Sequence, residues 1–157
     1  MFASFARAYR RIAPSQLLYR LADAARHRHR SRRSTIEQTH GRRGEDLAHR
    51  FLRRQGLKIV ARNFYQRAGH GELDIVAWDR GTLVFVEVKT RASAEFGDPA
   101  RAVGSEKEKG LRRAAAEYLR RCGAPPEQAR VDLVNILLGK PPRIEWIKDA
   151  FPISRTL

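Results

Sequence analysis

Hydrophobic and polar positions follow two different periods along this chain. Between residues 42 and 55 apolar residues recur at helical spacing, which predicts an amphipathic helix that Gly56 ends. The same period predicts a second helix from Ser105 to about Arg121. Other segments are short, apolar and rich in β-branched and aromatic residues, which is typical of strands. These strands are predicted over residues 57–63, 72–78, 82–88, 131–138 and 143–148.

The order of these elements is helix, strand, hairpin, helix, strand, strand. This order predicts an α/β fold, a sandwich with a central mixed sheet flanked by helices. A chain of 157 residues is long enough for one domain with a real core. We divide it into an N-terminal extension, residues 1–36, and a folded domain, residues 37–157. The extension is expected to be partly helical or disordered.

The centre of the predicted sheet is a hairpin over residues 71–91, with its turn at residues 79–81. Both arms are apolar on both faces, so charged residues in them are unexpected. Asp74, Glu87 and Lys89 each cost several kcal/mol there unless they are paired or bind something. Glu87 and Lys89 are two positions apart and project from one face. The hairpin brings Asp74 alongside them.

Two facing carboxylates suggest a cation between them. Their repulsion is roughly 4 kcal/mol at 4 Å and an effective dielectric of about 20. Mg²⁺ or Mn²⁺ suits oxygen ligands, here Asp74, Glu87 and the Val88 carbonyl. Lys89 would then hold a water or help to deprotonate it, and the reaction class is metal-assisted phosphodiester hydrolysis. Taken alone, Glu87 and Lys89 also fit a structural ion pair, and Asp74 fits an edge strand that faces water.

The charge balance points to a polyanionic partner. The net charge is +15 and the pI is about 11.2. Residues 1–36 carry nine arginines and one acid, and the remaining 121 residues are basic as well. Three interpretations of the extension stay open: a nucleic-acid-binding arm, a disordered or mis-assigned extension, and an Arg-rich transit peptide.

Two further features bear on location. No apolar run approaches the roughly 18 residues of a membrane span, so no membrane partner is expected. The single cysteine, Cys122, excludes an intramolecular disulfide and any multi-cysteine metal site. A reducing, cytoplasmic location fits both.

A set of short motifs occurs in order between Gly41 and the C-terminus. The motifs are Gly41-x-x-Gly44-Glu45-Asp46-x-Ala48, Arg62-Asn63-Phe64, Gly71-Glu72-Leu73-Asp74, Val84-Phe85-Val86-Glu87-Val88-Lys89-Thr90-Arg91, Phe96-Gly97-Asp98-Pro99, Ala102-Val103, Lys107 and Tyr118-Leu119. As a set they resemble the YraN-like family of small bacterial proteins. That family is classed with the PD-(D/E)XK nuclease superfamily and is similar to Holliday-junction resolvases.

The resemblance implies a restriction-endonuclease-like core in which Asp74, Glu87 and Lys89 are the catalytic Asp, Glu and Lys. It also implies that Glu45 on the first helix completes the metal site. From the residues alone, the preferred interpretation of Glu45 is a first-turn acid that the helix dipole favours. Nucleic-acid contacts are implied for Arg62, Arg91 and Lys107. For Lys107, a solvated helix charge is an equal alternative.

The function expected from these observations is metal-dependent endonuclease cleavage of branched or otherwise structured DNA, with Mg²⁺ or Mn²⁺. A non-catalytic DNA-binding module that keeps the nuclease core is the alternative. An RNA-associated basic protein is a third interpretation, but no RNA-binding motif with stacking aromatic residues is visible. The pattern leaves the substrate structure and a two-fold homodimer open.

Overall fold

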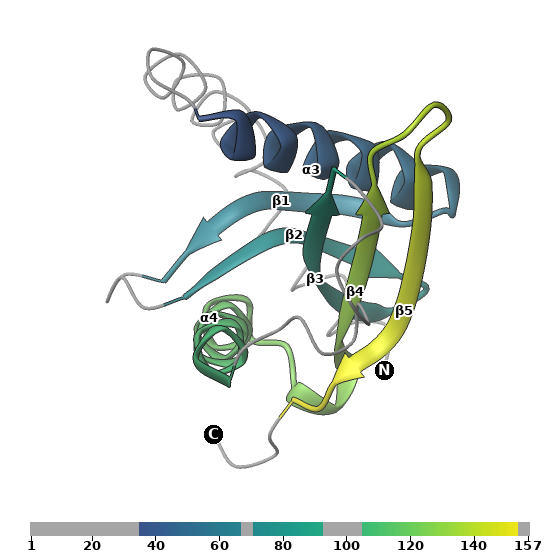
Figure 1. Cartoon of the computed structure of the whole chain (residues 1–157). Coiled ribbons are helices and arrows are strands. Elements are labelled where there is room, and N and C mark those ends of the chain that lie inside the picture. Colours follow the sequence, from purple (N-terminus) through teal and green to yellow (C-terminus); the bar gives the residue numbers. More distant parts are fainter. Residues whose placement is uncertain (1–34, 67–70, 93–104, 154–157) are drawn as a thin grey trace.

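The computed structural model describes residues 35–66, 71–92 and 105–153 (Figure 1). Most of the basic extension, and the prediction that it is helical or disordered, lie outside these residues. The elements are α3 (Ile36–Arg54), β1 (Lys58–Tyr65), β2 (Glu72–Asp79), β3 (Thr82–Arg91), α4 (Ser105–Cys122), the 3₁₀ turn η2 (Pro126–Gln128), β4 (Ala129–Leu137) and β5 (Arg143–Phe151).

The strands form one five-stranded sheet in the order β1-β2-β3-β4-β5. Neighbouring strands are antiparallel except β3 and β4, which are parallel. A parallel pair needs a crossover connection, and α4 lies in it. The predicted α/β fold with a mixed sheet is therefore confirmed, and it is consistent with a restriction-endonuclease-like sandwich.

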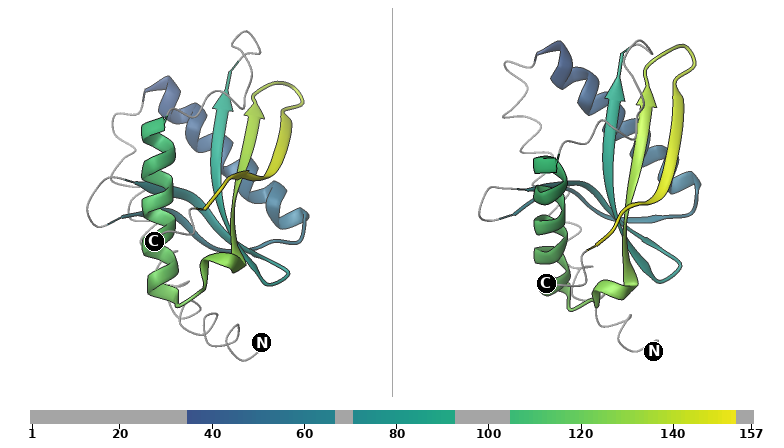
Figure 2. Two further views of the ribbon diagram at one scale, coloured as in Figure 1. Left: turned by 90° about the horizontal axis from the view of Figure 1, so that it is seen from below. Right: turned by 60° about the horizontal axis from the view of Figure 1, so that its bottom comes forward.

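In the described part of the chain, α3 covers one face of the sheet and α4 covers the other, as the views in Figures 1 and 2 agree. Ala48 and Leu52 of α3 pack on Val84 and its neighbours in one buried cluster. On the other face, the Tyr118 ring of α4 lies 5.7 Å from that of Phe85, edge to face. Burial of such large side chains contributes roughly 1.5–3 kcal/mol each, so both helices are held firmly against the sheet.

The first helix begins earlier than the hydrophobic pattern predicts. A start near residue 42 is wrong, because α3 begins at Ile36 behind a capping box. The Gln38 backbone N–H donates to Thr35 Oγ1, and the Thr35 N–H donates to Gln38 Oε1, both at 3.3 Å. This cap satisfies otherwise unpaired donors and extends the helix through a polar stretch that carries no apolar period. Thr35 and Ile36 therefore belong with the folded domain.

The hairpin at the centre of the sheet has the predicted position. Asp79 pairs with Thr82, which leaves Arg80 and Gly81 as a two-residue turn. Both have positive φ, 50° for Arg80 and 106° for Gly81. A tight hairpin requires this backbone conformation, and glycine adopts it without strain. The turn thereby sets the register that aligns the two arms.

The length and apolar character of α3 and α4 decide whether either helix could span a membrane. Neither helix in the described part of the chain is long and apolar enough to cross a membrane.

Candidate active site

The candidate site lies where β2 and β3 separate. Pairing between the two strands runs from the turn as far as Ile75 and Val86. At the next position, Asp74 Oδ2 accepts a hydrogen bond of 2.7 Å from the Val88 backbone N–H. The carboxylate takes the place of a strand carbonyl, and β1 and β2 turn away from β3 (Figures 1 and 2). Asp74 is thus held at the apex of a fork in the sheet.

Glu87 is the most deeply buried charged group at this fork, with no exposed surface. Its Oε1 lies 3.1 Å from Lys89 Nζ and 2.6 Å from Lys107 Nζ. Its Oε2 is buried and has no hydrogen-bond partner within the described part of the chain. A buried carboxylate oxygen without a partner costs about 1–3 kcal/mol or more. Glu87 therefore has one neutralised oxygen and one that is free to bind a ligand.

Asp74 is strongly affected by its surroundings. Burial raises the pKa of Asp74, and the negative charge of Glu87 raises it further, to about 8. The hydrogen bond from Val88 and the positive charge of Lys107 act in the opposite direction. In the absence of a cation, this raised pKa favours the protonated form of Asp74. A dication at this point would favour its ionised form.

Lys107 reaches this site from the first turn of α4. Burial alone would lower the pKa of Lys107, but contact with Glu87 and the charges of Glu87 and Asp74 raise it to about 12. Lys107 is therefore not simply a solvated helix charge, and its expected phosphate contact stays a prediction. The lysine is a charged partner of a buried glutamate, because the packing of α4 brings two distant parts of the chain together.

Glu45 lies on α3 in a second polar cluster, between that helix and β1. Burial raises the pKa of Glu45, while a hydrogen bond with Asn63 and the charge of Arg62 lower it. Arg62 lies 2.8 Å from the Asp46 carboxylate and 3.6 Å from that of Glu45. It also lies 3.4 Å from His49 Nδ1, and burial and Arg62 lower the pKa of that histidine. Arg62, predicted to contact nucleic acid, is thus held by side chains of α3.

Two glycines of the motifs bring the helices close to the fork. A Cβ on Gly44 would lie 1.7 Å from Thr90 Oγ1, so α3 crosses β3 at a distance that only glycine permits. A Cβ on Gly71 would lie 2.0 Å from the carbonyl oxygen of Gly110, which fixes the start of β2 against α4. The first contact positions Glu45 and the second positions the beginning of α4.

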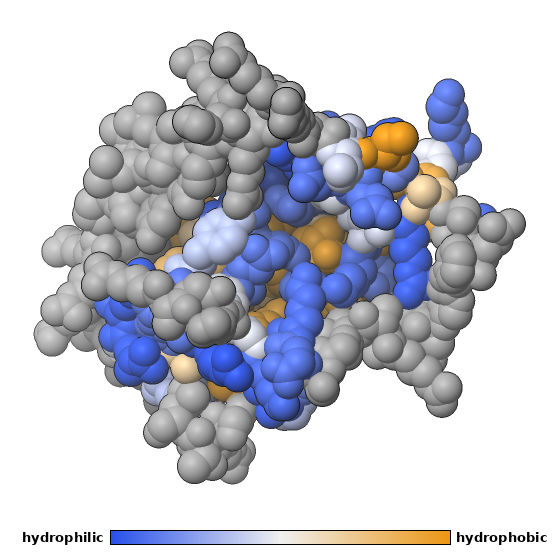
Figure 3. Space-filling view, turned by 60° about the vertical axis from the view of Figure 1, so that its left-hand side comes forward, coloured by the Kyte–Doolittle hydropathy of each residue, from blue (hydrophilic) through white to orange (hydrophobic). Residues whose placement is uncertain are grey.

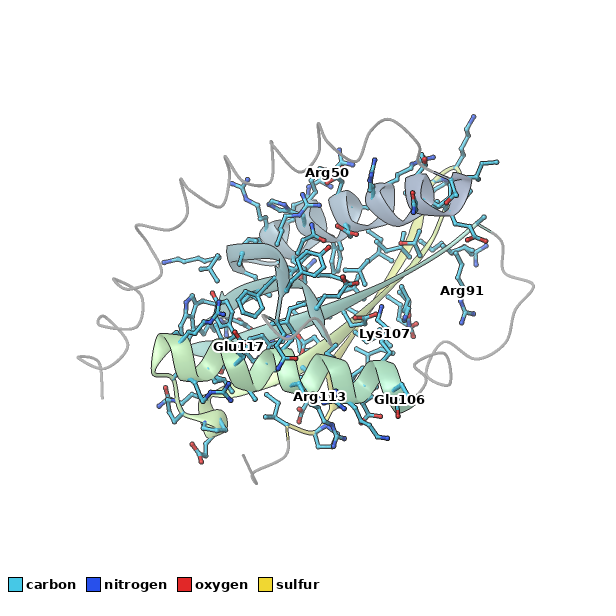
Figure 4. All side chains as sticks on the ribbon, turned by 90° about the vertical axis from the view of Figure 1, so that its left-hand side faces the viewer. Arg50, Arg91, Glu106, Lys107, Arg113 and Glu117 are labelled. Atoms are coloured by element: carbon cyan, nitrogen blue, oxygen red, sulfur yellow. The ribbon has the colours of Figure 1, made fainter. Side chains whose placement is uncertain are left out.

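Arg91 is the last residue of β3, and its carbonyl accepts a hydrogen bond of 2.8 Å from the Leu138 N–H. In Figure 4 the Arg91 side chain extends from the end of β3, below α3 and above the start of α4 in this view. Lys107 lies near this end of α4 in the same view. Among the described residues on this side of the protein, Figure 3 shows mostly hydrophilic ones, with a small area of hydrophobic residues between them.

The donors at the fork suit a hard cation. Asp74 and Glu87 supply carboxylate oxygens, one of them without a partner, and Mg²⁺ or Mn²⁺ prefers such ligands and retains waters. No three acidic, histidine or cysteine side chains of the described residues form a group that could hold a metal ion. Glu45 therefore does not join the other two carboxylates in a ready-made cluster, although its charge raises the pKa of Asp74.

The structure thus brings together Asp74, Glu87 and Lys89, as the sequence predicts, and adds Lys107. The partner of Lys107 could not be read from the sequence, since twenty residues separate it from Glu87. A charged residue in the first turn of a helix carries no signal of which strand that helix covers. The available signal was the Glu87 carboxylate itself, because a buried charge in an apolar strand requires a cation nearby.

A mixed sheet with α3 on one face and α4 on the other, an aspartate where two strands separate, and Glu-x-Lys on the next strand are consistent with the restriction-endonuclease-like core of PD-(D/E)XK nucleases. The chain belongs to the family described as "Uncharacterised protein family UPF0102", the YraN family, whose model matches residues 44–136. This family is a member of that nuclease superfamily.

Relatives from several bacteria support the assignment. A UPF0102 protein of Solibacter usitatus (strain Ellin6076) is 51% identical over 135 residues, which cover 86% of this chain and 98% of the relative. One from Koribacter versatilis (strain Ellin345) is 46% identical, over 73% of this chain and 80% of its own. One from Rhodococcus jostii (strain RHA1) is 44% identical, over 71% of this chain and 94% of its own.

Proposed function

We propose that this protein is a metal-dependent endonuclease that hydrolyses phosphodiester bonds in DNA, with branched or otherwise structured DNA as its substrate. The observation that carries the proposal is the buried, partnerless Oε2 of Glu87 beside Asp74 and Lys89. A site of this kind is incomplete without a cation. Family membership and the basic charge of the chain support the same activity.

Each residue has a role in this proposal. Asp74, Glu87 and the Val88 carbonyl would bind Mg²⁺ or Mn²⁺, with Glu45 contributing directly or through a water. When bound, the ion supplies a Lewis acid for a phosphoryl oxygen and lowers the pKa of a water. Lys89 orients the attacking water, because its ammonium group is anchored at Glu87 and lies one pleat further along β3.

DNA contacts in the proposal come from basic residues around the fork and from the extension over residues 1–36. Lys107 contacts Glu87 at 2.6 Å, and Arg91 follows Lys89 by two residues at the end of β3. Arg62 contributes by holding Asp46 and Glu45 in place, and a phosphate contact would require it to leave them. A two-fold homodimer and a cytoplasmic location fit cleavage of two strands in a branched DNA.

The test is a cleavage assay on linear, flapped and four-way DNA with Mn²⁺ or Mg²⁺. Asp74→Asn should abolish cleavage. Asp79→Asn is the matched control, because Asp79 lies at the other end of β2 and pairs with Arg130 at 2.7 Å, away from the fork. Equal cleavage by the wild type and Asp74→Asn, or no cleavage of any of these DNAs by the wild type, would refute the proposal.

A DNA-binding module without catalysis is the second candidate, and two observations favour it. Glu87 Oε1 is already neutralised by two lysines, and the described carboxylates form no ready-made group of three. This candidate predicts DNA binding that neither Mn²⁺ nor Asp74→Asn changes. Calorimetric titration with MnCl₂ separates the two, since only the nuclease requires a site that Asp74→Asn weakens.

A further inference from the structure

We propose that Lys107 is an internal counter-ion that occupies Glu87 in the metal-free protein and is released to a DNA phosphate when a divalent cation binds. This inference rests on the proposed function and adds a residue outside the Asp, Glu and Lys set. It gives the site a way to stay folded without metal and to couple metal binding to DNA binding.

The first support is the asymmetry of the contacts at Glu87. Lys89 and Lys107 both lie against Oε1, at 3.1 and 2.6 Å, while Oε2 has no hydrogen-bond partner among the described residues. A fully buried carboxylate such as that of Glu87 requires a positive charge beside it. Lys107 supplies that charge at the shorter distance. Lys107 therefore neutralises Glu87 in the metal-free protein, as a bound divalent cation would in the metal-bound protein.

The second support is the difference in exposure between the two lysines. The Lys107 side chain is 42% exposed, whereas that of Lys89 is 23% exposed and that of Glu87 is fully buried. Lys89 is fixed to β3 two residues from its partner, but Lys107 reaches across from a helix on a flexible four-carbon chain. Lys107 can therefore move into solvent at a low cost in free energy, whereas Glu87 is held inside the sheet.

Charge also requires the exchange. A dication bound to Asp74 and Glu87 would lie close to the Lys107 ammonium, and unlike Lys107 it can also contact Oε2. Repulsion between charges of +2 and +1 at about 4 Å is roughly 2 kcal/mol even in water and larger in a buried site. The displaced ammonium remains beside the place where a phosphate must approach the cation, so a phosphate is its natural new partner.

The packing of α4 keeps Lys107 within reach of both partners. Gly71 lies so close to the Gly110 carbonyl that a Cβ there would come within 2.0 Å of it. Gly110 is one turn beyond Lys107 on the same helix. The beginning of α4 is therefore fixed against β2, and only the lysine side chain has to move between the two states.

The first experiment measures metal affinity by calorimetric titration of the full chain with MnCl₂. Lys107→Met keeps the apolar stem and removes the charge. Lys109→Met is the matched control, because Lys109 lies on the same turn and pairs with exposed Glu106 at 2.7 Å. We expect Lys107→Met to bind Mn²⁺ roughly tenfold more tightly or better, since it no longer competes for Glu87. Lys109→Met should bind Mn²⁺ as the wild type does.

The second experiment measures DNA affinity against salt concentration, in EDTA and in Ca²⁺. In EDTA, Lys107 is paired with Glu87. Lys107→Met and the wild type should therefore show the same slope of log K for DNA against log salt concentration. In Ca²⁺, the slope for Lys107→Met should be smaller by about 0.9, the contribution of one duplex phosphate contact. A reduced slope in EDTA as well would show that Lys107 contacts phosphate without any exchange and would overturn the inference.

The outcomes distinguish this inference from the proposed function. If the wild type binds Mn²⁺ through Asp74 and Lys107→Met leaves that affinity unchanged or weaker, the counter-ion inference is wrong and the nuclease proposal stands. If neither the wild type nor Lys107→Met binds Mn²⁺, both are refuted. If only Lys107→Met binds it, competition by Lys107 is supported directly.

Discussion

Replacing Asp74 by asparagine tests the electrostatics of the fork without metal or DNA. The side-chain oxygen of asparagine can still accept the hydrogen bond from the Val88 N–H, so the change removes mainly the titrating group. The variant should therefore keep the fold and alter only how the free energy of unfolding depends on pH.

The sign and size of this effect follow from the pKa of Asp74. Burial and the neighbouring Glu87 raise it from 3.8 to about 8, so the folded state holds this proton more tightly than the unfolded state. The stability linked to this group is fully present below about pH 4 and is lost as the pH rises to about 8. At about 1.4 kcal/mol per pKa unit, the loss is on the order of 6 kcal/mol.

The assay is urea unfolding of both proteins in EDTA between pH 5 and pH 9. The wild type should lose stability relative to Asp74→Asn by up to about 1.4 kcal/mol per pH unit as far as pH 8, with no further change above it. Asp79→Asn is the control, because the hydrogen bond from Arg130 lowers the pKa of Asp79 and its linkage falls below this range. Parallel pH profiles for the wild type and Asp74→Asn would refute the reasoning.

Three further predictions address other parts of the protein. Lys89→Ala should keep Mn²⁺ binding and lose cleavage, whereas Glu87→Ala should lose Mn²⁺ binding; calorimetry showing that both bind Mn²⁺ normally would contradict the assigned roles. Deleting residues 1–34, which spares the cap of α3, should weaken DNA binding and flatten its salt dependence while turnover at saturation persists; an unchanged salt slope would show that the extension does not touch DNA. Gly44→Ala should lower the melting temperature, because its Cβ would overlap the Thr90 side chain of β3. Gly41→Ala has open space within α3 and should raise the melting temperature slightly, because alanine favours the helix; equal melting temperatures of the two variants would disprove the close crossing.

The sequence by itself determined the elements and the convergence of three charged residues. Strand and helix periods are local properties, and a hairpin turn sets the register of its own two arms. Once residues 80 and 81 form the turn, Asp74 must come alongside Glu87, and Lys89 must share the face of Glu87. This part of the site follows from fewer than twenty consecutive residues.

The start of the first helix shows where local patterns were insufficient. Residues 36–41 have no apolar stripe, so periodicity places the start too late, and the side chains of Thr35 and Gln38 decide it instead. The capping signal is present in the sequence. It is read only when polar residues are considered as hydrogen-bonding groups.

Only the tertiary structure decided which charges meet across elements. Lys107 pairs with Glu87, and Arg62 pairs with Asp46, because the packing of α4 and α3 on the sheet brings these side chains together. Those crossings depend on close approaches such as Gly44 against Thr90, between residues 46 positions apart. A buried carboxylate requires a cation, but which residue supplies that cation depends on which basic side chain lies near it in the folded protein. The sequence therefore predicts Lys89 beside Glu87, and the packing of α4 adds Lys107 as its second partner.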